Sequence, residues 1–284
     1  MHRSTIEWVL NPDNKTLGWV WNVITGCVNH INGMCKGGNF PCYAYQLANG
    51  RLKGRYLANH WIPDSLRGTD TDVLEALLDP FYPRFWPERL EEIKPSGAWW
   101  DTLGGRQAKG RFTCDMSDMF GIGVPEDWTR EIMEVIKSDP LDRFYLLTKQ
   151  SQNLAAWNPF PENAWVGITA TGIKAYKQAL TGLAITQARI KYLSFEPLLE
   201  RIPMSPPYSL DKFEIQWVII GQCTPVKNST KPSIESVREI VEACDKANIP
   251  CFLKYNLVGH IPVEEPFYQN DGTGWKIRQE MPTG

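Results

Sequence analysis

Three cysteines within the first 42 residues are the strongest chemical signal in this sequence. Cys27, Cys35 and Cys42 lie in a glycine-rich stretch that follows a short apolar run. A structural zinc ion usually takes four protein ligands, whereas an iron-sulfur cluster held by three cysteines keeps one iron open to a small molecule. The pattern therefore predicts a 4Fe-4S cluster with an open iron, which implies catalysis.

One histidine in the same stretch supports an alternative interpretation. Gaps of seven and six residues separate the three cysteines, and His30 lies in the first gap. A zinc knuckle of Cys27, His30, Cys35 and Cys42 is compatible with these gaps. This alternative accounts for the cysteines, but it does not account for the polar residues that follow the strands later in the chain.

The composition is that of an ordinary globular protein. Of the 284 residues, 43% are apolar and 12% are aromatic, and the formal net charge is −2. This charge provides no overall positive field for a nucleic-acid backbone or an anionic membrane. The sequence has no apolar run of about 18 residues and no charged leader before an apolar segment, so we expect a cytoplasmic protein with no membrane partner.

Short apolar runs alternate with amphipathic stretches from residue 111 onward. Such runs are typical of parallel strands buried on both faces. They cover residues 111–114, 143–148, 164–169, 190–195, 216–221 and 250–254, and a further strand is expected at 19–24. The pattern predicts an α/β fold with about six to eight βα units in one domain over residues 1–284. A partial or full parallel (β/α) barrel is expected, with an open doubly wound sheet as the alternative.

Two helices are marked by their ends. One begins at Pro125, a favourable first helical residue, and the other has Ser233 as its N-cap and ends near Asn248. Residues 53–110 are rich in proline, tryptophan and glycine and break the alternation. This segment is predicted to be an insertion packed on the barrel.

Polar residues follow the predicted strands. In parallel α/β sheets, side chains just beyond the carboxyl ends of the strands line the active site. Here these side chains are acids, amides, lysines and hydroxyls, which suit a zwitterionic ligand. They are Asp115, Ser117, Asp118, Thr148, Lys149, Thr169, Thr171, Glu196, Gln222, Cys223 and Lys254. For Asp118, capping of a turn is an equally good interpretation, and Glu196 could instead form an ion pair with Lys149 or Lys254.

Motifs along nearly the whole chain resemble those of the three-cysteine-motif proteins of phages and bacteria. That family is of unknown function and is related in pattern to radical S-adenosylmethionine (SAM) enzymes. The matching segments are TIEW (5–8), WN (21–22), TGC (25–27), CYA (42–44), DMSDMF (115–120), VP (124–125), LTK (147–149), WVG (165–167), SFEPLL (194–199), WVIIG (217–221) and FLK (252–254).

The chain departs from the family pattern in three places. Its cysteines are more widely spaced than is usual in the family, and residues 9–20 look inserted. After the sixth strand, where the family has Gly-Gly-Glu-Ser-Gly, this chain has GQCTP (221–225). The last difference changes the predicted floor of the active site.

The resemblance implies a radical SAM mechanism. Cys27, Cys35 and Cys42 would hold the cluster, and SAM would chelate the open iron through its amino and carboxylate groups. One-electron reduction would then yield a 5′-deoxyadenosyl radical that abstracts hydrogen. An electron donor of flavodoxin or ferredoxin type is expected. The residues expected to bind SAM are Asp115, Ser117, Asp118, Thr148, Lys149, Thr169, Glu196, Gln222 and Lys254.

The substrate and one catalytic residue are inferred less directly. Cys223 is predicted to return a hydrogen atom to a substrate radical, and a small buried turn residue is the alternative. Spore photoproduct lyases also carry a tyrosine directly after the last cluster cysteine, which favours a nucleic-acid or nucleotide substrate by analogy. Two other classes stay open: a non-catalytic zinc- or cluster-binding phage adaptor, and a non-radical SAM or nucleotide enzyme with a structural zinc.

Overall fold

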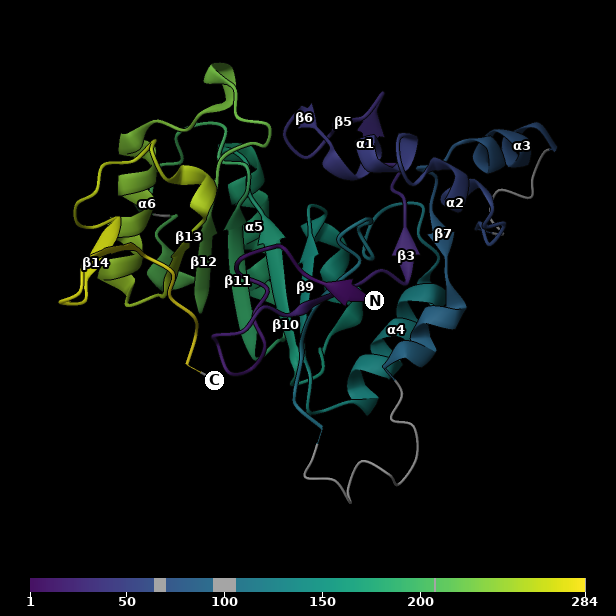
Figure 1. Cartoon of the computed structure of the whole chain (residues 1–284), viewed down its shortest axis with the longest axis horizontal. Helices are drawn as coiled ribbons and strands as arrows, with labels where there is room; N and C mark the ends of the chain where they lie inside the picture. The colour runs from purple at the N-terminus through teal and green to yellow at the C-terminus, as the bar shows by residue number, and fades with distance from the viewer. Residues whose placement is uncertain (64–69, 94–105, 207, 284) are drawn as a thin grey trace. The chain divides into compact units, whose positions relative to one another are not determined.

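The computed structural model describes residues 1–63, 70–93, 106–206 and 208–283 (Figure 1). These residues form two compact units. Unit 1 comprises Met1–Gln150 and Pro161–Ala164, and unit 2 comprises Ser151–Phe160 and Trp165–Gly284. Residues 64–69 and 94–105 of the predicted insertion lie outside the described residues. Among the described residues, no helix is long and apolar enough to cross a membrane.

Unit 1 contains a sheet segment in the order β1-β2-β8-β9. Strand β1 pairs antiparallel with β2, whereas β2, β8 and β9 are mutually parallel. All four residues of β8 are buried, including Arg111, whose guanidinium pairs with the buried Asp142 carboxylate. The elements are β1 (His2–Arg3), β2 (Trp19–Trp21), β3 (Ile24–Thr25), β4 (His30–Ile31), β5 (Met34–Cys35), β6 (Phe40–Pro41), α1 (Tyr43–Asn49), α2 (Lys53–Leu57), α3 (Asp70–Leu78), β7 (Arg84–Phe85), the 3₁₀ helix η2 (Pro87–Glu92), β8 (Gly110–Thr113), α4 (Glu126–Ser138) and β9 (Arg143–Thr148).

The first predicted strand is divided in two. The run expected at 19–24 becomes β2, which joins the parallel strands, and β3, which pairs antiparallel with β7. Asn22 lies at the division, and its side chain donates to Asp115 Oδ1 at 2.6 Å and accepts from the Met116 N–H at 3.2 Å. These bonds hold the chain to the segment after β8, so the two short strands serve different sheets.

Unit 2 contains four parallel strands in the order β10-β11-β12-β13. Strands β10 and β11 are buried at all six positions. A hairpin, β14-β15, lies near the carboxyl end. The elements are the 3₁₀ helix η3 (Ser151–Trp157), β10 (Ala164–Thr169), α5 (Ile173–Ile185), β11 (Ile190–Phe195), η4 (Leu210–Lys212), β12 (Trp217–Ile220), η5 (Asn228–Thr230), α6 (Ile234–Ala247), β13 (Cys251–Leu253), η6 (Tyr255–Leu257), β14 (Tyr268–Asn270) and β15 (Trp275–Ile277).

The predicted α/β class, with mostly parallel strands, is confirmed. The described strands of the two sheet segments number eight, four in each unit, and all except β1 are parallel to a neighbour. Neither set of four closes on itself. Both predicted helix starts are confirmed: α4 follows Pro125, and the Ser233 hydroxyl caps α6 by accepting from the Ser236 N–H at 3.0 Å. Helix α6 ends at Asn248 in a left-handed conformation, as expected for a C-cap.

Candidate functional site

A three-stranded antiparallel sheet folds the cysteine stretch in unit 1. Strand β5 pairs with β4 and β6, which places Cys35 opposite His30 on one side and Phe40 on the other. Cys42 directly precedes α1, and its backbone N–H donates to the Gly33 carbonyl at 2.8 Å. Figure 1 shows β5, β6 and α1 grouped together. The wide cysteine spacing is therefore taken up by a small sheet, which brings the thiols back toward one another.

Gly26 fixes the backbone before the first cysteine. Its φ is +86°, in the left-handed region that glycine adopts without cost. A Cβ at this position would lie 2.3 Å from the Tyr82 carbonyl oxygen and 2.5 Å from that of Phe81. The Cys27 N–H donates to the same Phe81 carbonyl at 2.8 Å. Residues 81–82 of the predicted insertion thus form one wall of the cysteine stretch.

The three thiols are close enough to influence one another. Burial raises the pKa of Cys27 to about 12, and the neighbouring Asp118 carboxylate and the other two cysteines act in the same direction. Burial also raises the pKa of Cys42, an effect opposed by the backbone of Tyr45 and by the Lys149 ammonium. Without a metal or another electrophile, the Cys27 and Cys42 sulfurs therefore stay protonated at neutral pH.

Backbone N–H groups point at two of the sulfurs. Asn29 donates to Cys27 Sγ at 3.3 Å, and Gly37 donates to Cys35 Sγ at 3.4 Å. Hydrogen bonds of this kind stabilise sulfur that carries negative charge, and they tune iron-sulfur clusters. This donor pattern is compatible with thiolate ligands, although the buried Cys114 thiol also receives backbone hydrogen bonds, from Val23 and Ile24.

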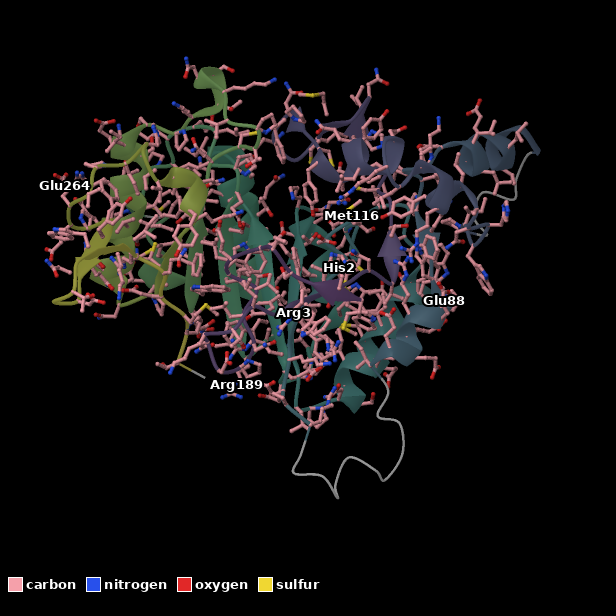
Figure 2. The ribbon with its side chains drawn as sticks, in the orientation of Figure 1. His2, Arg3, Glu88, Met116, Arg189 and Glu264 are labelled. Atoms are coloured by element: carbon pink, nitrogen blue, oxygen red, sulfur yellow. The ribbon has the colours of Figure 1, made fainter. Side chains whose placement is uncertain are left out.

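An apolar cluster covers the cysteine stretch. Its buried members come from α1, α2, the 81–86 segment and the turn after β8, and Cys27 and Cys42 pack against it. The buried residues are Ala44, Ala48, Tyr56, Phe81, Trp86 and Met116. Figure 2 labels Met116, which lies just beyond the carboxyl end of β8. This packing half-buries Cys27 and Cys42 against apolar side chains.

A single ion and an iron-sulfur cluster make different demands on the donor set. A zinc ion needs all of its ligands at about 2.0 to 2.3 Å from one point, whereas a 4Fe-4S cluster binds each cysteine at a different iron. In the part of the chain that the structure describes, no group of three or more His, Cys, Asp and Glu side chains has a geometry that could hold a metal ion. Three thiols with N–H donors and an apolar cover remain chemically suited to a cluster.

His30 is engaged in packing and hydrogen bonding. Its Nδ1 accepts from the Gly33 N–H at 3.3 Å, and its ring lies 5.0 Å from that of Tyr45 and 5.3 Å from that of Phe81. Burial lowers the pKa of the imidazole. These contacts give His30 a structural role in the cysteine stretch, which weakens its assignment as a zinc ligand.

The acidic segment after β8 is tied into the protein. Asp118 accepts from the Thr148 hydroxyl at 2.8 Å, from the Lys149 N–H at 3.1 Å and from the Phe120 N–H at 3.2 Å. Burial nevertheless raises its pKa. Asp118 thus links the turn after β8 to the end of β9, in agreement with the capping interpretation. Thr148 is used in the same link.

The other two residues of this segment face the cysteine stretch. Ser117 donates its hydroxyl to the Gly26 carbonyl at 2.6 Å, so it supports the cysteine loop directly. Asp115 accepts from Asn22, and its backbone carbonyl accepts from the Tyr43 hydroxyl. Burial raises the pKa of the Asp115 carboxyl. Their predicted contact with SAM stays a prediction.

Polar residues at the strand ends of unit 2 form a second group. Glu196, directly after β11, forms an ion pair with Lys254, directly after β13, at 2.5 Å between Oε1 and Nζ. The Ser194 hydroxyl donates to the other carboxylate oxygen at 3.2 Å. Of the two lysines that the sequence offered to Glu196, the structure pairs Lys254 with it.

The first residue of the GQCTP segment, Gly221, packs against this ion pair. A Cβ on Gly221 would lie 2.9 Å from Lys254 Cδ and 3.3 Å from Glu196 Cγ, so glycine is needed for close packing. Gln222 donates its side-chain amide to the Asn256 carbonyl, and its Oε1 is buried without a hydrogen-bond partner. The hydroxyl of Thr169, at the end of β10, is also buried without a partner. Two unsatisfied groups at strand ends are what a ligand site would leave.

Cys223 is 5% exposed and directly follows Gly221 and Gln222. Its burial agrees with the small-turn-residue interpretation, and the predicted hydrogen-atom donation stays a prediction. Cys114, Cys244 and Cys251 are also buried.

Comparison with known proteins places the chain in a family. The family described as "Protein of unknown function (DUF5131)" matches residues 3–265. The chain belongs to the DUF5131 family. No curated protein matches it, and neither does any solved structure. The DUF5131 description names no reaction, so the chemistry must be argued from the residues of the site.

Sequence reasoning missed several supporting residues of this DUF5131 member. Asn22 holds the segment after β8, and Asn256 accepts from the Gln222 N–H at 3.3 Å and donates to the Gln222 carbonyl at 2.8 Å. Arg84 is fully buried, and its guanidinium donates to five backbone carbonyls around the end of α3. The TGC motif at 25–27 is the one sequence signal that points to such supporting residues, since a glycine directly before a predicted ligand indicates a constrained turn.

Proposed function

We propose that this DUF5131 protein is a radical SAM enzyme whose Cys27, Cys35 and Cys42 hold a 4Fe-4S cluster on a barrel-like parallel sheet. The observation that carries the proposal is the convergence of three thiols, of which Cys35 is buried and Cys27 and Cys42 are half-buried. The sulfurs of Cys27 and Cys35 accept backbone N–H groups at 3.3 and 3.4 Å.

The chain's own residues would position and protect the reactive group. Gly26 and Ser117 fix the backbone around Cys27, and the Gly33 carbonyl fixes Cys42. The apolar cluster around Met116 covers one side of Cys27 and Cys42. When bound, a three-cysteine cluster supplies the electron that cleaves SAM to the radical that abstracts hydrogen.

Each unit holds its own group of polar side chains that we propose as ligand-binding residues. In unit 1, Asp115 and Lys149 supply charges beside the cysteine stretch. In unit 2, Thr169 and Gln222 present buried polar atoms without partners, and the Glu196–Lys254 pair offers groups for hydroxyls or a carboxylate. A nucleic-acid or nucleotide substrate and a flavodoxin- or ferredoxin-type electron donor complete the proposal.

The test is anaerobic reconstitution followed by spectroscopy and product analysis. We expect a broad brown 4Fe-4S absorbance, which Cys27→Ala, Cys35→Ala and Cys42→Ala each abolish. We also expect 5′-deoxyadenosine after addition of dithionite and SAM. Cys244→Ala, which changes a buried cysteine of α6, is the matched control and should retain iron.

Two outcomes would reject the proposal. One is full iron retention in any of the three early variants. The other is stoichiometric zinc in both aerobic and anaerobic preparations, which would favour an adaptor or a non-radical enzyme with structural zinc.

A further inference from the structure

Lys149 lies against the cysteine stretch along the whole length of its side chain. A Cβ built on Gly37 would lie 2.9 Å from Lys149 Cδ, 3.2 Å from Lys149 Cβ and 3.4 Å from Cys35 Sγ. The lysine stem and the Cys35 sulfur are therefore neighbours on either side of a residue without a side chain. The Lys149 ammonium lies 6.0 Å from the centre of the Phe40 ring, which is opposite Cys35 in the β5–β6 pair.

The backbone of Lys149 is held as firmly as its side chain. Its N–H donates to Asp118 Oδ2 at 3.1 Å, and Asp118 is buried and also bonded to Thr148 and Phe120. The cation thus rests on a fixed turn, not on a flexible loop. Its charge acts on Cys42, whereas the Asp118 charge acts on Cys27. The two ends of the cysteine stretch therefore meet charges of opposite sign.

A fixed cation beside an iron-sulfur cluster has a definite electrostatic effect. Reduction adds one negative charge to the cluster, and a positive charge in a partly desolvated site stabilises that added charge. The effect of an exposed lysine is much weaker because water and salt screen it.

We propose that Lys149 sets the reduction potential of the cluster held by Cys27, Cys35 and Cys42, and that Gly37 is glycine so that the lysine stem can lie against Cys35. This inference rests on the proposed function. It assigns Lys149 a role in tuning the cluster that does not require SAM, in addition to the ligand contact expected from the sequence.

The experiment is a potentiometric titration of the reconstituted protein without SAM, followed by electron paramagnetic resonance. In Lys149→Met, the equilibrium constant for reduction should fall about tenfold, which is about 59 mV for a one-electron couple. Lys149→Arg keeps the charge and should stay within about threefold of the wild type. Gly37→Ala keeps the charge but displaces the stem, and it should shift the potential in the same direction as Lys149→Met. Lys36→Met removes an exposed charge from the same loop and is the matched control.

Each result decides the matter. A wild-type potential in a Lys149→Met protein with full iron content overturns the inference, and weaker SAM binding in that protein would then assign Lys149 to the ligand alone. An equal shift in Lys36→Met also overturns it, because the effect would be one of net charge. Failure of the wild type to assemble any cluster rejects the proposed function itself, which is a different outcome.

Discussion

Replacement of Gly26 by alanine tests how the fold holds the first cysteine. At φ +86°, a residue with a Cβ costs about 1 to 2 kcal/mol more than glycine. The added Cβ would also lie 2.3 Å from the Tyr82 oxygen and 2.5 Å from the Phe81 oxygen, so the 81–82 backbone must move. That movement weakens the bond from the Cys27 N–H to Phe81, which contributes about 1 kcal/mol. We expect a total loss of about 2 to 4 kcal/mol.

The assay is urea denaturation of the metal-free protein, with iron content after reconstitution as a second readout. Gly26→Ala should shift the unfolding midpoint to lower urea, and its iron content should fall even where the protein remains folded, because Cys27 is displaced. Gly54→Ala is the control, since a Cβ there meets nothing within 4 Å and the residue lies in α2. That change should be neutral or stabilise by about 0.5 to 1 kcal/mol.

The reasoning fails if Gly26→Ala and Gly54→Ala unfold at the same urea concentration. It also fails if Gly26→Ala is destabilised as expected but binds iron like the wild type, because the turn would then not position Cys27.

Three further predictions concern the frame around the site. Arg84→Met should lower the free energy of unfolding by about 3 kcal/mol or more in chemical denaturation, because it leaves buried carbonyls without their donors. Arg84→Lys should recover only part of this loss, since an ammonium has three donors for five acceptors. Full recovery in Arg84→Lys would contradict this reasoning. Lys254→Met should cost about 2 kcal/mol by removing the ammonium that pairs with the Glu196 carboxylate. Addition of Glu196→Gln should restore part of the loss in a thermal melt, whereas strictly additive losses would argue against the pair. Burial raises the pKa of the Cys114 thiol from 9.0 to about 12. At pH 8, alkylation of Cys114, followed by mass spectrometry, should therefore be about a thousandfold slower than that of a free thiol. The stability that this pKa difference contributes is present below pH 9 and is lost as the pH rises toward 12; alkylation at the rate of an unfolded peptide would contradict both statements.

The parallel strands could be predicted because their signal is local. Strands β9, β10 and β11 begin and end at the residues expected from their mainly apolar runs, because strands buried on both faces are rich in apolar residues. The same holds for α6, whose Ser233 cap and Asn248 end are encoded by single residues. The motifs also indicated a family of unknown function, and the DUF5131 match agrees with the prediction at that level.

The small sheet of the cysteine stretch could not be predicted in this way. Strands β4, β5 and β6 have two residues each, which is too short for any periodic signal. The place of this small sheet in unit 1 depends on contacts between residues far apart in sequence, such as Cys27 with Phe81 and Gly26 with Ser117. The predicted insertion at 53–110 supplies Phe81 and Tyr82, whose backbone lies against Gly26 and Cys27.

The sequence by itself determined the α/β class, the positions of the main strands and helices, and the set of polar residues at the strand ends. Only the tertiary structure decided the partners of those polar residues. It paired Glu196 with Lys254, used Asp118 to join two turns, and placed Lys149 beside Cys35. The physical reason is that local patterns fix which side chains reach a sheet edge, whereas partner choice depends on distances between segments that only the folded chain brings together.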